Sequence, residues 1–356
     1  MKERDSNFEL LRLFSIFGIL CMHIFGMFYT NLQGIQMIEC LSINAVFNTG
    51  VTCFVLISGY FGIKRDWTKI IKMIIMTFIY SFSTYIILVY TKTVEFEWLS
   101  LIKSILPVVS SKYWFITCYI ILSALAPYIN QFAEKIDKKL FIKLITTLLI
   151  IFSIIPTFMY FDITNDSGKG IINMTLAYLI GRYIGLYHKN DTIDKKRIGI
   201  ILAISILCTF LVNGIVSMIS GHVTLGIWFK DSAFFVIISA ICIFLLFKTM
   251  TVKNKVINIL AKNVLYIYIL DSFIRKIINR VFDISPYINK WYIIFIVFMY
   301  ALVVCMIAII ISYLVELILG KFIKKISRFI YNHMCNIAVK IRRVLDKYKL
   351  LYIFQN

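Results

Sequence analysis

NFELLRLFSIFGILCMH, residues 7–23, is apolar enough to enter a lipid bilayer and yet carries Glu9, Arg12 and His23. On an α-helix with about 100° per residue, the eleven steps from Arg12 to His23 end only about 20° past three full turns. Glu9 precedes Arg12 by three residues, so all three groups share one face. Because ionisable groups facing lipid are costly, this face is predicted to look into a helical bundle, with His23 about 16 Å beyond Arg12 along the axis.

The composition of the whole chain indicates a polytopic membrane protein. Of 356 residues, 60% are hydrophobic and 16% are charged. Apolar runs recur throughout and approach the roughly 20 residues that span a bilayer, whereas a β-barrel would show short alternating segments. No small-residue cleavage site follows the first run, so we interpret it as a span and not as a signal peptide. We predict an all-α polytopic protein with about ten transmembrane helices, at 8–29, 43–63, 70–90, 113–132, 141–160, 171–187, 198–219, 229–249, 257–280 and 291–319.

The distribution of Lys and Arg predicts that both chain termini are cytoplasmic. With the N-terminus inside, 27 of the 38 Lys and Arg residues lie on the cytoplasmic side and 9 lie outside. This bias follows the positive-inside rule. After residue 320, basic residues alternate with Phe, Ile, Leu and Tyr, which predicts an amphipathic tail on the cytoplasmic leaflet. We therefore divide the chain into a transmembrane domain, 1–320, and a basic tail, 321–356.

The net charge of +20 does not indicate a nucleic-acid partner, because basic cytoplasmic loops that face anionic lipid account for it. The eight Cys residues are scattered, with no Cys-x-x-Cys pair and no zinc-ligand spacing. The sequence therefore predicts no metal site.

The ionisable residues of the first span have two interpretations. Glu9 and Arg12 can form an interfacial ion pair, with the Arg12 side chain extended toward the membrane surface. His23 can be a hydrogen-bonded structural residue, but a histidine within a membrane is a functional-site hypothesis by default, because its titration range suits proton transfer. We interpret His23 as functional.

Three blocks of sequence carry the strongest functional signal. Glu-x-x-Arg and Arg-x10-His overlap within residues 9–23, FVLISGYFGIKR occupies 54–65, and KYWFITCYIILSALAPYIN occupies 112–130. In this order, in a chain with about ten spans, the blocks resemble the acyltransferase-3 family of integral membrane acyltransferases, including its Gram-positive members that modify polysaccharides. The resemblance covers roughly residues 7–330.

The resemblance implies an acyltransferase of class EC 2.3.1.- in the bacterial plasma membrane. The expected reaction moves an acyl group, by default acetyl from cytoplasmic acetyl-CoA, to a hydroxyl of a cell-surface polysaccharide or its lipid-linked precursor. We expect His23 to be the general base that takes the hydroxyl proton. Glu9 is expected to orient Arg12 or to balance its charge.

The acyl donor is polyanionic, so cytoplasmic cations are expected to bind it. Arginine recognises phosphate through two hydrogen bonds, and lysine does so as a point charge. The positive-inside rule explains Lys64 and Arg65 slightly better than binding does, and Ser58 with its neighbour Gly59 can equally mark close helix packing. The expected donor-binding residues are Arg12, Ser58, Lys64, Arg65 and Arg182.

The expected acceptor-binding residues are Tyr113, Trp114 and Asp271. Aromatic residues at the end of a span are also explained by the aromatic belt, but the resemblance favours a role of Tyr113 and Trp114 beside the acceptor. Asp271, in IYILDSFIRK (267–276), occupies the place where members of the family often carry a late histidine. Either Asp271 substitutes for it and pairs with Arg275 at i,i+4, or this late site is altered.

Two other classes of function compete with the enzyme. A transporter or flippase would also have about ten spans and charged groups within the membrane. Transporters often have discontinuous helices at corresponding places of two repeated halves, which four scattered prolines and no visible repeat argue against. A sensory membrane protein is disfavoured, because the chain shows no soluble output module.

Overall fold

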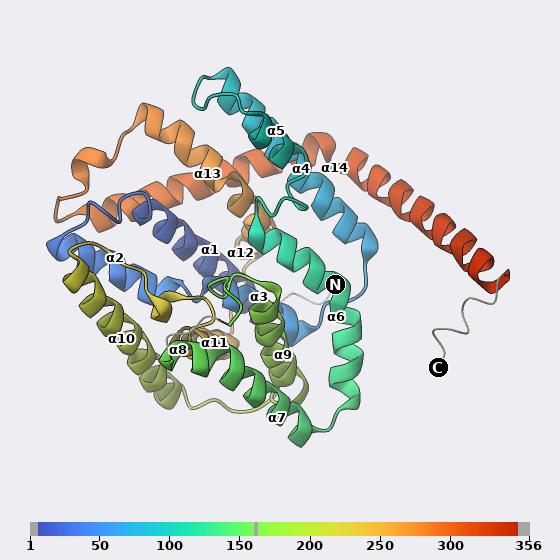
Figure 1. Cartoon of the computed structure of the whole chain (residues 1–356), viewed down its shortest axis with the longest axis horizontal. Coiled ribbons are helices and arrows are strands. Elements are labelled where there is room, and N and C mark those ends of the chain that lie inside the picture. The colour runs from blue at the N-terminus through green and yellow to red at the C-terminus, as the bar shows by residue number, and fades with distance from the viewer. Residues whose placement is uncertain (1–5, 160–162, 348–356) are drawn as a thin grey trace.

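The computed structural model describes residues 6–159 and 163–347, and every regular element in these ranges is a helix (Figure 1). The absence of strands from these ranges confirms the all-α prediction. A π-helical turn at Ile150–Ile154 joins α7 to α8, and a 3-10 turn at Ala261–Asn263 joins α12 to α13. The α-helices are α1 (Asn7–Phe25), α2 (Gly34–Phe47), α3 (Gly50–Phe61), α4 (Trp67–Tyr90), α5 (Trp98–Ile105), α6 (Trp114–Lys135), α7 (Lys138–Leu149), α8 (Ile155–Phe158), α9 (Ile171–Tyr187), α10 (Lys195–Ser220), α11 (Phe234–Lys248), α12 (Lys255–Leu260), α13 (Val264–Val281) and α14 (Ile293–Lys347).

Eight helices in the described ranges are long and apolar enough to cross a membrane, counting α2 with α3, α7 with α8, and α12 with α13 as single spans. This confirms a multi-pass helical protein. The predicted spans at 171–187 and 229–249 correspond to α9 and α11, which have 17 and 15 residues. These helices are shorter than the roughly 20 residues that cross a hydrocarbon core, so the count of ten spans and the cytoplasmic termini stay predictions.

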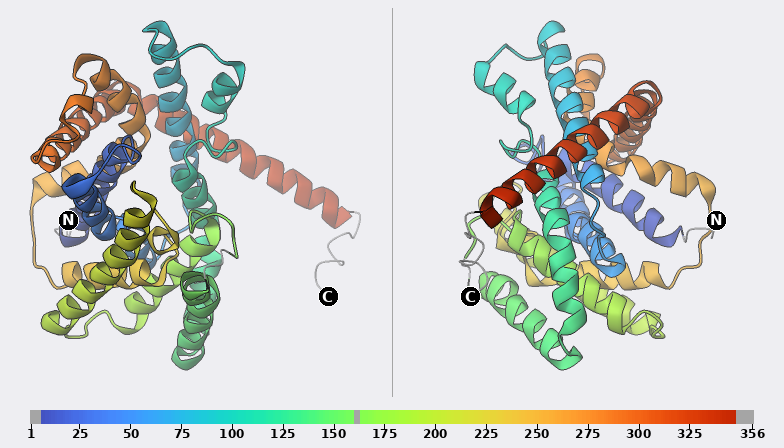
Figure 2. Two further views of the ribbon diagram at one scale, coloured as in Figure 1. Left: turned by 60° about the vertical axis from the view of Figure 1, so that its left-hand side comes forward. Right: turned by 90° about the vertical axis from the view of Figure 1, so that its right-hand side faces the viewer.

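Three elements differ from the predicted organisation. The second predicted span, 43–63, begins too late, since α2 already starts at Gly34. The segment between the third and fourth predicted spans contains the short helix α5. No helix break lies at residue 320, because α14 continues for 55 residues and extends far beyond the other helices (Figures 1 and 2). Placement of the tail on the membrane surface stays a prediction.

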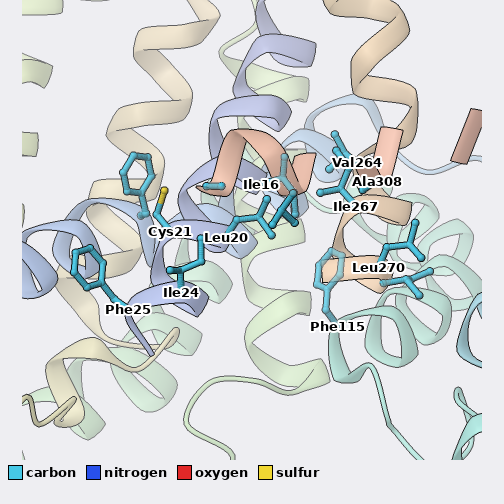
Figure 3. Close-up of a cluster of buried hydrophobic side chains, with 14 of the residues drawn as sticks. Ile16, Leu20, Cys21, Ile24, Phe25, Phe115, Val264, Ile267, Leu270 and Ala308 are labelled. Atoms are coloured by element: carbon cyan, nitrogen blue, oxygen red, sulfur yellow. The ribbon is translucent and has the colours of Figure 1, made fainter. Parts of the chain in front are cut away.

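Helix α1 lies at the centre of the packing. Its side chains join a buried cluster with residues of α13, α14 and α6, part of which Figure 3 shows. Leu20 and Ile24 of α1 and Ile267 of α13 have no exposed surface. Because the apolar residues of α1 are held from several sides, its one polar face has a defined position against the neighbouring helices.

Glycines allow α3 and α9 to approach backbone to backbone. A Cβ atom at Gly59 of α3 would lie 2.1 Å from the carbonyl oxygen of Tyr178 in α9. On the other side of the contact, a Cβ atom at Gly181 would lie 2.3 Å from the carbonyl oxygen of Leu56. Small residues at such contacts are typical of close helix pairs in membranes. This is the packing role that the sequence offered for Gly59.

Gly59→Ala is therefore expected to destabilise the protein by about 1–3 kcal/mol, because its Cβ meets rigid backbone. The measurement is the temperature at which detergent-solubilised protein loses its monodisperse peak in size-exclusion chromatography. Gly199→Ala in α10 is the matched control, since a Cβ there meets no atom within 4 Å. Equal unfolding temperatures for the two variants would contradict the close contact.

Candidate active site

His23 on α1 and Asp271 on α13 are joined by a short hydrogen bond. His23 Nδ1 lies 2.7 Å from Asp271 Oδ2, although the residues are 248 positions apart in the sequence. The Asp271 side chain is 4% exposed, whereas that of His23 is 40% exposed. The carboxylate is therefore enclosed while the imidazole keeps an accessible face.

Arg275 holds the other side of the Asp271 carboxylate. Its Nε donates to Asp271 Oδ1 at 2.7 Å, and a terminal nitrogen donates to Oδ2 at 3.0 Å. The other terminal nitrogen donates to the main-chain oxygen of His23 at 3.3 Å. The i,i+4 pair expected from the sequence is thus present, and it also contacts the end of α1. Tyr300 on α14 completes the support, because its hydroxyl donates to Asn279 Oδ1 at 2.6 Å and lies 3.2 Å from the carbonyl oxygen of Arg275.

This arrangement suits a general base. A carboxylate at Nδ1 favours the tautomer that carries its proton there, which leaves Nε2 with a free lone pair. The bidentate contact with Arg275 fixes the carboxylate in turn. The structure thus places Asp271 against His23, as the orienting residue of the pair.

A cavity of about 910 Å³ lies against this group of residues, and we name it the outer cavity after the predicted orientation, in which the N-terminus is cytoplasmic. His23, Asp271 and Arg275 line it, as do Tyr113 and Trp114 at the start of α6. The three residues expected to bind the acceptor therefore line one cavity together with the candidate base.

A second cavity, of about 230 Å³, which we name the inner cavity, lies toward the other end of α1. Arg12 and Ser58 line it, as does Tyr119, whose hydroxyl is 3.2 Å from Ser58 Oγ. A terminal nitrogen of Arg12 lies 3.0 Å from both carboxylate oxygens of Glu9, as the i,i+3 spacing predicted. Lys262, in the 3-10 turn before α13, brings a second cation to the same wall.

Ile19, Val51 and Tyr268 line both cavities, and we name these three residues the septum. They come from α1, α3 and α13. The septum thus lies between Arg12 and His23, the two residues that the first span presents on one face. These three residues are shared by the walls of the two cavities.

The comparison with known families decides the class of the protein. The family model described as an acyltransferase domain, Acyl_transf_3, matches residues 5–315. The chain belongs to the acyltransferase-3 family. No curated protein and no solved structure matches the chain. Members of the family are acyltransferases, so the site described above belongs to an acyltransferase embedded in a membrane.

Three residues expected to bind the donor lie elsewhere in the acyltransferase. Lys64 and Arg65 are exposed after α3, and the Arg65 guanidinium lies over the Tyr128 ring, 5.1 Å from its centroid. Arg182 pairs with Glu134 of α6. None of the three lines the inner or the outer cavity. Lys262 is the cation that lines the inner cavity together with Arg12. In the sequence it is one of many basic residues near the ends of the predicted spans.

Two groups at the outer cavity, which lie just before α6 and α11, have shifted pKa values. Burial, with a smaller contribution from the charge of Lys276, lowers the pKa of Lys112 to about 8. Burial raises the pKa of Asp231 to about 7, against the opposing charge of Lys169. All four residues line the outer cavity, which the sequence did not indicate for any of them.

Within the described residues, no group of three or more His, Cys, Asp or Glu side chains is arranged to hold a metal.

Val51→Trp tests the connection between the cavities. The indole would fill the space at the septum, so acyl transfer is expected to fall by about 100-fold, as when reacting groups are held apart. The measurement is transfer of radiolabelled acyl groups in membranes at matched protein levels. Ile310→Trp is the control, because that α14 residue is 59% exposed and lines neither cavity. An undiminished rate for Val51→Trp would show that reactants do not meet across the septum.

Proposed function

We propose that this acyltransferase moves an acyl group, most simply acetyl from cytoplasmic acetyl-CoA, onto a hydroxyl of a cell-surface polysaccharide or of its lipid-linked precursor in the bacterial plasma membrane. The observation that carries the proposal is the His23–Asp271–Arg275 group on the wall of a 910 Å³ cavity that meets the Arg12 cavity at the septum. A large outer cavity suits a sugar acceptor, and the two cations of the small inner cavity suit a phosphate group of the donor.

The inner cavity supports donor binding through charge. Acetyl-CoA carries its phosphates at one end and its thioester at the other end of a long flexible arm. Arg12 and Lys262 would bind phosphate oxygens, with Glu9 holding the Arg12 guanidinium in place. Ser58 lines the same cavity, and its hydroxyl, which donates to the carbonyl oxygen of Phe54 at 3.0 Å, would accept a hydrogen bond from an amide of the arm. The thioester would then reach the septum at Ile19, about 10 Å along α1 from Arg12 and one turn short of His23.

His23 supplies the base in the proposed reaction. Its Nε2 takes the proton of the acceptor hydroxyl as that oxygen attacks the thioester carbonyl carbon, forming the new carbon–oxygen bond. The carbon–sulfur bond then breaks, and the same proton passes from His23 to the leaving sulfur. Asp271 acts as a positioning residue, since it stabilises the imidazolium that exists between the two proton transfers. The products are an ester on the acceptor and free CoA.

Tyr113 and Trp114 support a sugar as the acceptor. Both line the outer cavity beside His23, and the Tyr113 ring lies 6.3 Å from that of Tyr268, a septum residue. Aromatic faces give apolar contact while their polar edges form hydrogen bonds, a combination that suits sugars. The aromatic residues would hold the sugar ring so that one hydroxyl faces Nε2 of His23.

His23→Ala is expected to remove the ester from the surface glycan of the native host. The measurement is NMR of the extracted glycan before and after mild alkali, with variant and unmodified chain at matched membrane levels. His222→Ala, which changes an exposed histidine in the loop before α11, is expected to keep the ester. A glycan without any ester that depends on this protein would refute the proposed function, and an ester that survives His23→Ala would refute the role of His23 alone.

Asp271→Asn tests the positioning role. The amide keeps the size of the side chain but no longer orients or stabilises a charged imidazole, so kcat is expected to fall by about 10²–10⁴-fold. The KM for acetyl-CoA should stay unchanged, because Asp271 lies outside the inner cavity. Asp283→Asn, in the exposed turn after α13, is the matched control. A variant with wild-type kcat, or one that changes KM alone, would show that Asp271 does not act through His23.

A further inference from the structure

Lys112 is held in the wall of the outer cavity by neutral groups. Its Nζ donates to Ser81 Oγ of α4 at 3.0 Å and to Ser104 Oγ of α5 at 2.8 Å. Both serines are fully buried. The ammonium group also lies over the Tyr113 ring, 5.8 Å from its centroid. Of its three N–H donors, the third has no hydrogen-bond acceptor among the described residues. The serines therefore fix a cation in a defined position while leaving one donor available at the cavity.

Lys276 brings a second positive charge to the same cavity. It follows Arg275 on α13, lines the outer cavity, and forms no ion pair or hydrogen bond within the described part of the chain. Burial lowers the pKa of Lys112, and the positive charge of Lys276 lowers it further because the two ammonium groups repel one another. Glu95 and Glu97 also line the cavity, but neither forms an ion pair with either lysine in the described ranges.

The two lysines line one cavity, and neither is paired with a carboxylate among the described residues, so together they can bind an anion. Arg275 does not compete for such an anion, because its guanidinium is already held by Asp271. We propose that Lys112 and Lys276 form an anion-binding subsite of the outer cavity, which holds a phosphate or carboxylate group of the acceptor while one of its hydroxyls reaches His23. This inference rests on the proposed function, and it gives the acceptor a chemical class, an anionic glycan.

The anionic group can come from two sources that share the same oxyanion chemistry. It can be the diphosphate that links a growing glycan to its lipid carrier, or a carboxylate on the sugar itself. In either case the aromatic side chains of Tyr113 and Trp114 lie on the same wall as the cations. The subsite would then set which residue of the glycan is acylated, since the hydroxyl must lie at a fixed separation from the charge.

The experiment measures binding and transfer separately. Purified full-length protein in nanodiscs, with saturating CoA present to fill the inner cavity, is titrated with inorganic diphosphate or with glucuronate, and the unfolding temperature is followed. At least one probe is expected to raise it. Lys112→Gln and Lys276→Gln are each expected to weaken that probe about 10- to 100-fold, the effect of losing one charge-assisted contact. Lys290→Gln, at an exposed lysine outside both cavities, should bind as the unmodified chain does.

Each outcome decides the subsite. Stabilisation by diphosphate alone assigns the charge to the lipid carrier, and stabilisation by glucuronate alone assigns it to the sugar. The proposal is overturned if neither probe stabilises the protein. It is also overturned if a stabilising probe binds the two glutamine variants as tightly as it binds the unmodified chain. Transfer of radiolabelled acetyl to the endogenous glycan in host membranes is measured in parallel. Probe binding without any transfer by the unmodified chain would refute the proposed function while the anion subsite stands.

Discussion

The hydrogen bond between His23 and Asp271 is the interaction on which the site and much of the bundle depend. Ionisable groups within a membrane have to satisfy one another, and here one carboxylate is shared by an imidazole and a guanidinium. Arg275 also reaches the main chain at the end of α1, and Tyr300 ties the arrangement to α14. Helix α1 is thus held against α13 and α14, which lie near the other end of the sequence, by the same groups to which we assign the chemistry.

In the proposed reaction, the polar groups along α1 assign the two substrates to two separate cavities. Arg12 lies at the small cavity with Lys262, and His23 lies at the large cavity with the aromatic residues of α6. The charged end of a donor and the sugar of an acceptor would therefore bind to opposite ends of one helix. The thioester of the donor and a hydroxyl of the acceptor would then meet at the septum. In this arrangement neither substrate has to cross the whole bilayer.

The first span and the helical class could be predicted from the sequence because both follow from local periodicity. The same reasoning found the i,i+4 pair of Asp271 and Arg275, but it did not predict that Asp271 contacts His23, since a contact across 248 residues depends on how α1 and α13 pack. The sequence did not indicate which cations line the inner cavity. The positive-inside rule places many Lys and Arg residues near the cytoplasmic ends of spans, and only the packing of the turn before α13 directs Lys262 toward Arg12.

The septum has a consequence for the permeability of the membrane. Two cavities lie toward opposite ends of α1, and only the septum separates them. Without the septum they would form one continuous opening along the helix. Ile19 and Val51 are apolar, and apolar constrictions exclude water and ions without closing completely. Their size therefore has to satisfy two opposite demands, passage of a thin flexible chain and resistance to protons and ions. The membrane potential of the cell limits how wide this passage can become.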